Sequence, residues 1–209
     1  MRIGIIGSGN VGGALGKRWS QLGHEVIFGS REPESEKIGQ LVAQAGHKAR
    51  AADSALAAQT SDVIVLSIPW RAAKAAVESL PDLSGKVLID VLNPLLPDLS
   101  GLELGASTSA AEQVAQWAPG ARVVKCFNTV GFNVMLNPAF GTDKAVMFYC
   151  GDDAEAKHIV RQLTNELGFD PVDAGPLRQA RLLEPFALLW ISLAFSGHGR
   201  EIAFKLLHR

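Results

Sequence analysis

Gly7-Ser8-Gly9-Asn10-Val11-Gly12 follows the apolar run Arg2–Ile6 and opens an amphipathic segment. The spacing fits the G-x-G-x-x-G turn that holds a dinucleotide pyrophosphate between a strand and a helix. There the first glycine allows a tight bend, the second lets the backbone approach the anion, and the third lets the helix pack closely on the strand. Free N–H groups and the positive end of the helix dipole attract the phosphates. The stretch therefore predicts a dinucleotide-binding unit at the N-terminus, with Gly7, Ser8, Gly9, Asn10, Val11 and Gly12 around the pyrophosphate.

Apolar runs alternate with amphipathic or alanine-rich segments along the chain. Nearly continuous apolar runs are typical of strands covered on both faces, and the alternation predicts an α/β fold with a Rossmann-type, doubly wound parallel sheet. The expected strands are Arg2–Ile6, Glu25–Gly29, a short one near Lys48–Ala51, Asp62–Ile68, Lys86–Val91, Arg122–Phe127 and Ala145–Cys150. The expected helices are Asn10–Leu22, Glu34–Ala45, Ser54–Ala58, Ala72–Leu80 and Ser107–Trp117.

A small C-terminal α/β extension is expected to follow. We predict an NADP-binding Rossmann domain over residues 1–139 and a smaller unit over residues 140–209, packed together as one compact domain. After Gly151-Asp152-Asp153, an aspartate can cap a helix over Ala154–Leu167. A strand over Phe169–Asp173 and a long apolar helical tail over Leu177–Leu207 come next. Pro185, Gly197 and Gly199 are expected to divide that tail.

The composition is that of an ordinary globular protein. Apolar residues make up 47% of the chain, and the formal net charge of −1 gives no electrostatic reason to expect nucleic acid or an anionic membrane. Cys126 and Cys150 show no metal-ligand spacing, so we predict reduced thiols and no metal site. The apolar stretch Phe186–Phe195 is about ten residues long, whereas a membrane span needs about 20. With no secretory signal at the N-terminus, we expect no membrane span and a cytoplasmic protein.

The end of the second strand indicates NADP(H). NAD sites carry an acidic residue here that accepts hydrogen bonds from the ribose hydroxyls. This chain instead has Ser30-Arg31, and a hydroxyl and a guanidinium are donors suited to a phosphate dianion. We therefore predict that Ser30 and Arg31 bind the 2′-phosphate. The alternative is that Arg31 is only a solvated surface charge.

Several motifs occur together in an order typical of one family. The glycine turn and Gly29-Ser30-Arg31 are followed by Ile68-Pro69-Trp70, Cys150-Gly151-Asp152-Asp153 and Asp173-Ala174-Gly175-Pro176-Leu177. With them the chain resembles, over essentially its whole length, the NADPH-dependent reductases of coenzyme F-420 (F420, an 8-hydroxy-5-deazaflavin). It also resembles the cytosolic domain of six-transmembrane metalloreductases, which use NADPH and a flavin.

The resemblance implies hydride transfer between NADP(H) and a deazaflavin or flavin, in a homodimer. By matching positions, Ser67, Ile68, Pro69 and Trp70 would contact the dinucleotide, and Asn93 and Pro94 would lie near the nicotinamide. Asn128 and Thr129 would line the place where the two rings meet. The chain departs from the deazaflavin reductases at Asn128, where they carry a histidine, and at Glu32, where they carry a second arginine. These differences bear on the identity of the hydride acceptor more than on the use of NADP(H) as the hydride donor.

Hydride transfer between two such rings needs little acid–base help, because the rings carry the chemistry and the protein supplies orientation and exclusion of water. No side chain is therefore assigned as catalytic with certainty, and the candidates for positioning a ring are Trp70, Asn93, Asn128 and Thr129. The asparagine motifs follow strands, at the edge where open α/β sheets bind ligands. Their alternatives are plain packing for Trp70 and turn chemistry for the asparagine motifs. The loop Leu95–Ser107 is a candidate lid.

Two other functions stay open. One keeps the enzyme class and changes the acceptor to a flavin or ferric chelate, and the other is a non-catalytic NADP(H)-sensing module. The apolar segment Leu182–Phe195 is expected to lie in the core or in a homodimer interface.

Overall fold

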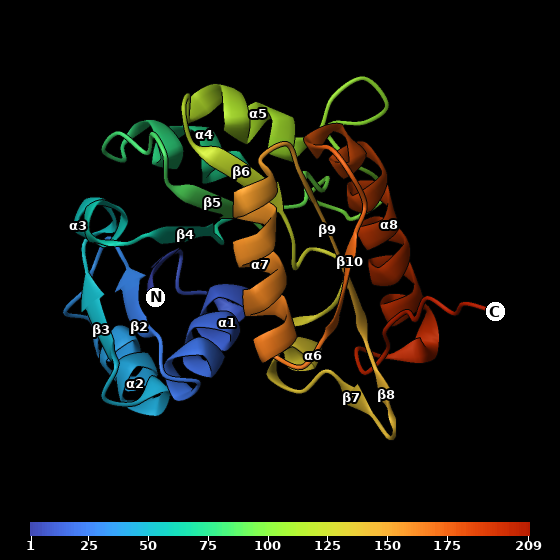
Figure 1. Ribbon diagram of the computed structural model, residues 1–209, viewed down its shortest axis with the longest axis horizontal. Coiled ribbons are helices and arrows are strands. Elements are labelled where there is room, and N and C mark those ends of the chain that lie inside the picture. Colours follow the sequence, from blue (N-terminus) through green and yellow to red (C-terminus); the bar gives the residue numbers. More distant parts are fainter.

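The computed structural model describes residues 1–209, and its main sheet has eight strands in the order β10-β9-β6-β5-β4-β1-β2-β3 (Figure 1). The six strands from β3 to β6 are parallel and follow the Rossmann order 3-2-1-4-5-6. Strand β9 pairs antiparallel with β6, and β10 pairs parallel with β9. The predicted α/β fold with a doubly wound, mostly parallel sheet is confirmed.

The strands are β1 (Arg2–Ile6), β2 (Glu25–Gly29), β3 (Ala49–Ala52), β4 (Val63–Leu66), β5 (Val87–Asp90), β6 (Arg122–Lys125), β9 (Val146–Gly151) and β10 (Asp170–Asp173), with β7 (Ala139–Phe140) and β8 (Asp143–Lys144) forming a separate hairpin. The helices are α1 (Asn10–Gln21), α2 (Glu36–Ala45), α3 (Ser54–Thr60), α4 (Trp70–Glu78), α5 (Ala110–Trp117), α6 (Phe132–Leu136), α7 (Ala154–Glu166) and α8 (Ala180–Leu193). Short turns η1 (Leu177–Gln179) and η2 (Ala194–His198) flank α8.

Element boundaries follow local capping. Asp153 begins α7 as expected, because its side chain accepts a 2.7 Å hydrogen bond from Ala156 N–H. Helix α5 begins at Ala110, later than the predicted Ser107, because the Ser109 hydroxyl accepts from Glu112 N–H and fixes the first turn.

Helices cover both faces of the sheet and form two cores. The larger core packs α1, α2, α6 and α7 against one face, with Trp19, Phe127 and Phe169 among its largest buried side chains. The second packs α3, α4, α5 and the start of α8 against the other face. With both faces covered, the central strands are buried along almost their whole length, as their apolar sequences predicted.

The expectation that Pro185 divides the C-terminal helix is wrong. Helix α8 runs through Pro185, which lacks the N–H that would bond to the Arg181 carbonyl, and packing of Leu183, Ala187 and Trp190 outweighs that loss. The helical stretch Leu177–His198 has 22 residues and a mean hydropathy of 1.2, so it is long and apolar enough to cross a membrane by these two measures alone. Only the glycines end it, since Gly197 and Gly199 take left-handed φ values of 109° and 71°.

The expected helical tail stops at η2, and residues 200–209 are not helical. Residues 202–204 lie against β9 and α8, where Val146 N–H donates to the Phe204 carbonyl at 2.9 Å and Trp190 Nε1 donates to the Ile202 carbonyl at 2.8 Å, whereas residues 205–209 are exposed. Because β9 and β10 extend the main sheet, residues 140–209 share its hydrogen bonding. The division at residue 139 stays a prediction.

Candidate active site

The glycine turn has the geometry that its spacing predicts. Gly7 has a φ of 100°, and a Cβ there would lie 2.2 Å from the Ser67 carbonyl oxygen. A Cβ at Gly12 would lie 2.1 Å from the Gly7 oxygen, so the start of α1 packs directly on the turn. A Cβ at Gly9 would meet nothing within 4 Å. Gly9 thus exposes backbone to open space at the start of α1, where unpaired N–H groups suit a pyrophosphate.

A cavity of about 480 Å³ lies next to this turn, at the carboxyl ends of β1, β4 and β5. The order of the strands reverses between β1 and β4, which is where doubly wound sheets bind ligands. Its walls are Gly9, Asn10, Val11, Ser67, Ile68, Pro69, Trp70, Arg71, Val91, Leu92, Asn93, Leu95 and Pro97. The fold therefore brings together three predicted segments from distant parts of the chain. Ser8 lines a neighbouring groove between α1 and α2, and Pro94 is buried behind the cavity.

Ser30 and Arg31 lie at the end of β2, beside the glycine turn. Gly7 N–H donates to the Gly29 carbonyl at 3.4 Å, so the end of β2 adjoins the pyrophosphate turn. The Ser30 hydroxyl accepts a 3.1 Å bond from Glu32 N–H, and the exposed Arg31 makes no hydrogen bond or ion pair within the chain. These residues stand outside the cavity wall, at a place suited to the adenosine end of a dinucleotide.

Trp70 occupies a position compatible with both of its predicted roles, packing and a ring wall. Its ring stacks on Trp117 with centroids 5.3 Å apart, and it also lines the cavity. Its Nε1 donates to Glu103 Oε2 at 3.1 Å, and Arg71 Nε donates to Glu103 Oε1 at 3.4 Å. Glu103 belongs to the candidate lid Leu95–Ser107, so Trp70 and Arg71 hold this loop against the cavity.

The two predicted asparagines contact each other. Asn93 Nδ2 donates to the Asn128 carbonyl and Asn128 Nδ2 donates to Asn93 Oδ1, both at 3.0 Å, while Asn128 Nδ2 also reaches the Leu183 carbonyl. Asn93 faces the cavity, whereas Asn128 lies one layer behind it. Phe127 turns the chain here with a left-handed φ of 59°, strained for a residue with a side chain.

Thr129 is not brought to the cavity. It is 1% exposed, and its hydroxyl donates to the Met147 sulfur at 3.8 Å, within the core. The hydroxyl side chain itself gave no indication of which way it would point after the turn at Phe127. Of the four candidates for positioning a ring, Trp70 and Asn93 therefore face the cavity directly.

Sequence reasoning missed a buried ionic cluster next to the asparagines. Lys125 Nζ lies 2.9 Å from Asp90 Oδ2 and 2.8 Å from Glu184 Oε1, and the side chains are between 0% and 2% exposed. Glu184 also accepts from Ala110 and Ala111 N–H at the start of α5, at 3.0 and 3.3 Å. A signal was present, because each charge interrupts an otherwise apolar strand or helix.

Burial and the neighbouring charges shift the pKa values of Lys125 and Glu184 in this cluster. Burial works to lower the pKa of Lys125, but the charges of Asp90 and Glu184 and the hydrogen bonds to both outweigh it and raise that pKa. Burial raises the pKa of Glu184, and the attraction of Lys125 offsets only part of this effect. Lys125 therefore remains an ammonium.

Comparisons with known proteins agree with this geometry. Residues 2–94 match the family model for coenzyme F420-dependent NADP oxidoreductases. The chain is 28% identical over 220 residues to the F420-dependent NADP reductase of Methanothermobacter marburgensis, covering 99% of this chain and 98% of that protein. It is 33% identical over 190 residues to the rat metalloreductase STEAP3, covering 90% of this chain but only 36% of that protein. A crystal structure of a candidate F420-dependent NADP reductase from Arthrobacter sp. FB24 superposes with a TM-score of 0.90, at 30% identity and full coverage of both chains.

The Rossmann sheet, the glycine turn and the cavity at its switch point define a dinucleotide-binding fold, and the relatives make the chain an NADP-dependent oxidoreductase. Within that class, the chain belongs to the family of coenzyme F420-dependent NADP reductases.

Proposed function

We propose that this protein transfers hydride between NADP(H) and coenzyme F420. The observation that carries the proposal is the cavity of about 480 Å³ between the glycine turn and Asn93, on a chain that aligns along 98% of a named F420-dependent NADP reductase. In this proposal the cavity receives the nicotinamide beside Asn93, and its side open to solvent leaves an approach for an acceptor ring, which favours an enzyme over a sensing module.

Each part of the site has a separate task in this proposal. The backbone at Gly9 and the start of α1 hold the pyrophosphate, and Ser30 and Arg31 hold the 2′-phosphate. When bound, NADPH supplies the hydride from C4 of its nicotinamide, and the acceptor takes that hydride and a proton. Trp70 and Asn93 orient the rings, while the loop Leu95–Ser107 excludes water from between them.

The decisive experiment measures NADPH oxidation in parallel with F420, FMN, FAD and a ferric chelate. We expect F420 to be reduced, with deuterium from one face of the nicotinamide recovered on a carbon of the deazaflavin. Gly9→Val is the control, because it should abolish the reaction by blocking the dinucleotide. NADPH binding with no acceptor reduced would contradict the proposal and favour a sensor.

A second candidate acceptor is a flavin or a ferric chelate. The identity of 33% to a metalloreductase favours it, although the chain spans about a third of that protein's length. Reduction of FAD or ferric chelate, but not of F420, would establish this acceptor in place of the deazaflavin.

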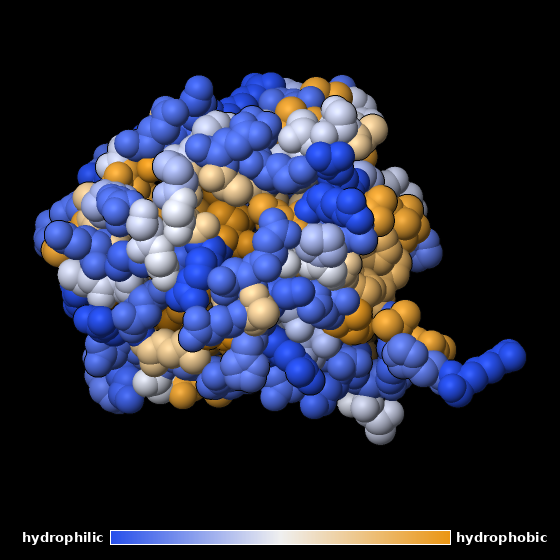
Figure 2. Space-filling view, turned by 45° about the horizontal axis from the view of Figure 1, so that its top comes forward, coloured by the Kyte–Doolittle hydropathy of each residue, from blue (hydrophilic) through white to orange (hydrophobic).

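We further propose that a second copy of the chain covers α8. Leu182, Leu189 and Phe195 are 65%, 49% and 66% exposed. Leu182 also lines an apolar cavity of about 270 Å³ together with Phe148 and Phe186. Figure 2 shows hydrophobic residues gathered on the side of the molecule where α8 lies. A face of this kind is typical of an interface, and a symmetric dimer would bury α8 on both copies.

Light scattering tests the dimer. We expect twice the chain mass of 22.2 kDa at micromolar concentration. Leu182→Glu with Leu189→Glu should give the monomer mass, while the control Leu56→Glu, at an exposed leucine on α3, should not. A monomeric wild-type protein would contradict the proposal. The expected cytoplasmic location also stays a prediction.

A further inference from the structure

The buried cluster Asp90–Lys125–Glu184 forms hydrogen bonds with the backbone of Leu92. Asp90 Oδ1 accepts from Leu92 N–H at 2.9 Å, and Lys125 Nζ donates to the Leu92 carbonyl oxygen. The backbone N–H and the carbonyl oxygen of Leu92 are therefore both hydrogen-bonded to side chains of the cluster. Leu92 and its neighbours Val91 and Asn93 form the wall of the cavity where the nicotinamide is placed.

The cluster also joins elements that are far apart in the sequence. Asp90 and Lys125 are the last residues of β5 and β6 and are register partners, so both stand at the carboxyl edge. Glu184 comes from α8, and it ties that helix to Lys125 and to the first N–H groups of α5. Asn128 adds a parallel link, because it bonds to Asn93 and to the Leu183 carbonyl.

Stability alone does not account for three buried charges. Removing charges from water is costly, and replacing a buried ion cluster by apolar residues often leaves a protein as stable or makes it more stable. What such a cluster provides is a fixed geometry, since charge-assisted hydrogen bonds are short and directional. Here the group whose geometry is fixed is the Leu92–Asn93 backbone.

We propose that Lys125, held between Asp90 and Glu184, is a positioning residue that sets the Leu92–Asn93 wall against the nicotinamide ring and couples α8 to it. Lys125 is completely buried and does not touch the cavity, so it acts through Leu92. The inference rests on the proposed placement of the nicotinamide in this cavity.

The test compares NADPH with 2′,5′-ADP, a fragment that keeps the phosphate contacts and lacks the nicotinamide. We expect Lys125→Met to weaken NADPH binding by about tenfold or more, as misplaced positioning groups do, and to leave 2′,5′-ADP binding within about twofold. The emission of bound NADPH, which reports on its nicotinamide, should shift toward that of the free cofactor. Asp90→Asn keeps the shape of the side chain and should change the affinity ratio in the same direction by less.

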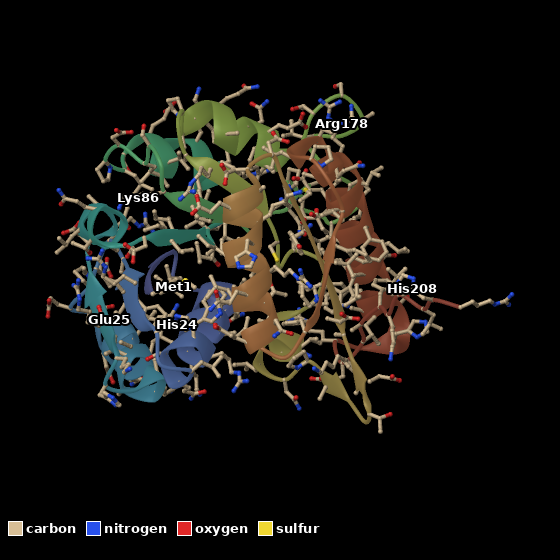
Figure 3. All side chains as sticks on the ribbon, viewed as in Figure 1. Met1, His24, Glu25, Lys86, Arg178 and His208 are labelled. Atoms are coloured by element: carbon tan, nitrogen blue, oxygen red, sulfur yellow. The ribbon has the colours of Figure 1, made fainter.

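The matched control breaks another side-chain hydrogen bond, at the opposite edge of the sheet. His24 Nε2 lies 2.8 Å from Glu166 Oε2, and Figure 3 shows His24 beside Met1, where the parallel strands begin. His24→Gln should lower the unfolding temperature without changing the ratio of the two affinities. The proposal is overturned if Lys125→Met and Asp90→Asn leave the ratio unchanged, or weaken both ligands equally. If the wild-type protein does not bind 2′,5′-ADP, the proposed phosphate site is contradicted, and this inference, which rests on it, is overturned too.

Discussion

The two ends of the candidate site are built in different ways. At β1 and the start of α1 the proposed pyrophosphate site is made of backbone: Gly7 and Gly12 allow the turn and Gly9 leaves open space beside it. At β5 and β6 the cavity wall is held by buried side chains, and the ammonium of Lys125 connects two strands with α8. A phosphate is bound by N–H groups that any sequence provides once the turn forms, whereas a flat ring needs a wall of fixed position.

The largest effect should come from the backbone end. Gly9→Val places a side chain in the open space reserved for the pyrophosphate, so calorimetry should detect no NADPH binding. The fold should survive, because a Cβ at this position meets no neighbour. Gly39→Ala is the control, since it lies in α2 with equally open surroundings and should bind normally. Normal binding by Gly9→Val would place the anion elsewhere.

The next effect concerns the choice of cofactor. Arg31→Ala should weaken NADPH binding by about 2 kcal/mol, or roughly 30-fold, because a charge-assisted bond to the 2′-phosphate is lost. NADH binding should hardly change. Arg50→Ala removes another exposed arginine, at the neighbouring strand β3, and should leave both affinities unaltered. Equal affinity of the wild-type protein for the two cofactors would contradict the assignment of Ser30 and Arg31.

An effect of similar size is expected at the side-chain end, but on turnover. Trp70→Ala removes the ring stacked on Trp117 and the hydrogen bond to Glu103, so the cavity wall and the loop loosen together. We expect turnover about tenfold to a hundredfold slower, which corresponds to about 1.4–2.8 kcal/mol in the barrier. NADPH affinity should fall by less than turnover does, because the phosphate contacts are elsewhere. Loss of binding equal to the loss of turnover would show that the two ends are not separate.

The smallest effect is on stability, through the ion pair Arg181–Glu112 that joins α8 to α5. The hydrogen bond from Arg181 lowers the pKa of Glu112 in the folded protein, with a further contribution from Ser109 and an opposing one from burial. A lowered carboxyl pKa stabilises the fold above the ordinary value of 4.5 and stops doing so as pH falls through the lowered value. Urea midpoints of the wild type and Glu112→Gln should therefore differ slightly at pH 6 and converge in acid. A difference that grows in acid would contradict this sign.

Sequence predicted the backbone end well, because its chemistry is local. The strands β1 and β2 have the predicted bounds, and the roles of Gly7, Gly9 and Gly12 follow from spacing alone. Prediction failed where long-range packing decided the outcome. Pro185 was expected to divide α8 but does not, Thr129 turns into the core, and Asn128 lies behind Asn93 and does not line the cavity.

By itself, the sequence determined the class of fold, the phosphate turn and the choice of NADP(H), because hydrophobic period, glycine spacing and the residues after β2 act within a few positions of one another. Only the tertiary structure decided how the other end of the site is built. Asp90, Lys125 and Glu184 are separated by 35 and 59 residues, and each alone is an unexplained charge in an apolar segment. They become one cluster only when β5, β6 and α8 meet, since a buried charge is tolerated where the fold brings it a partner.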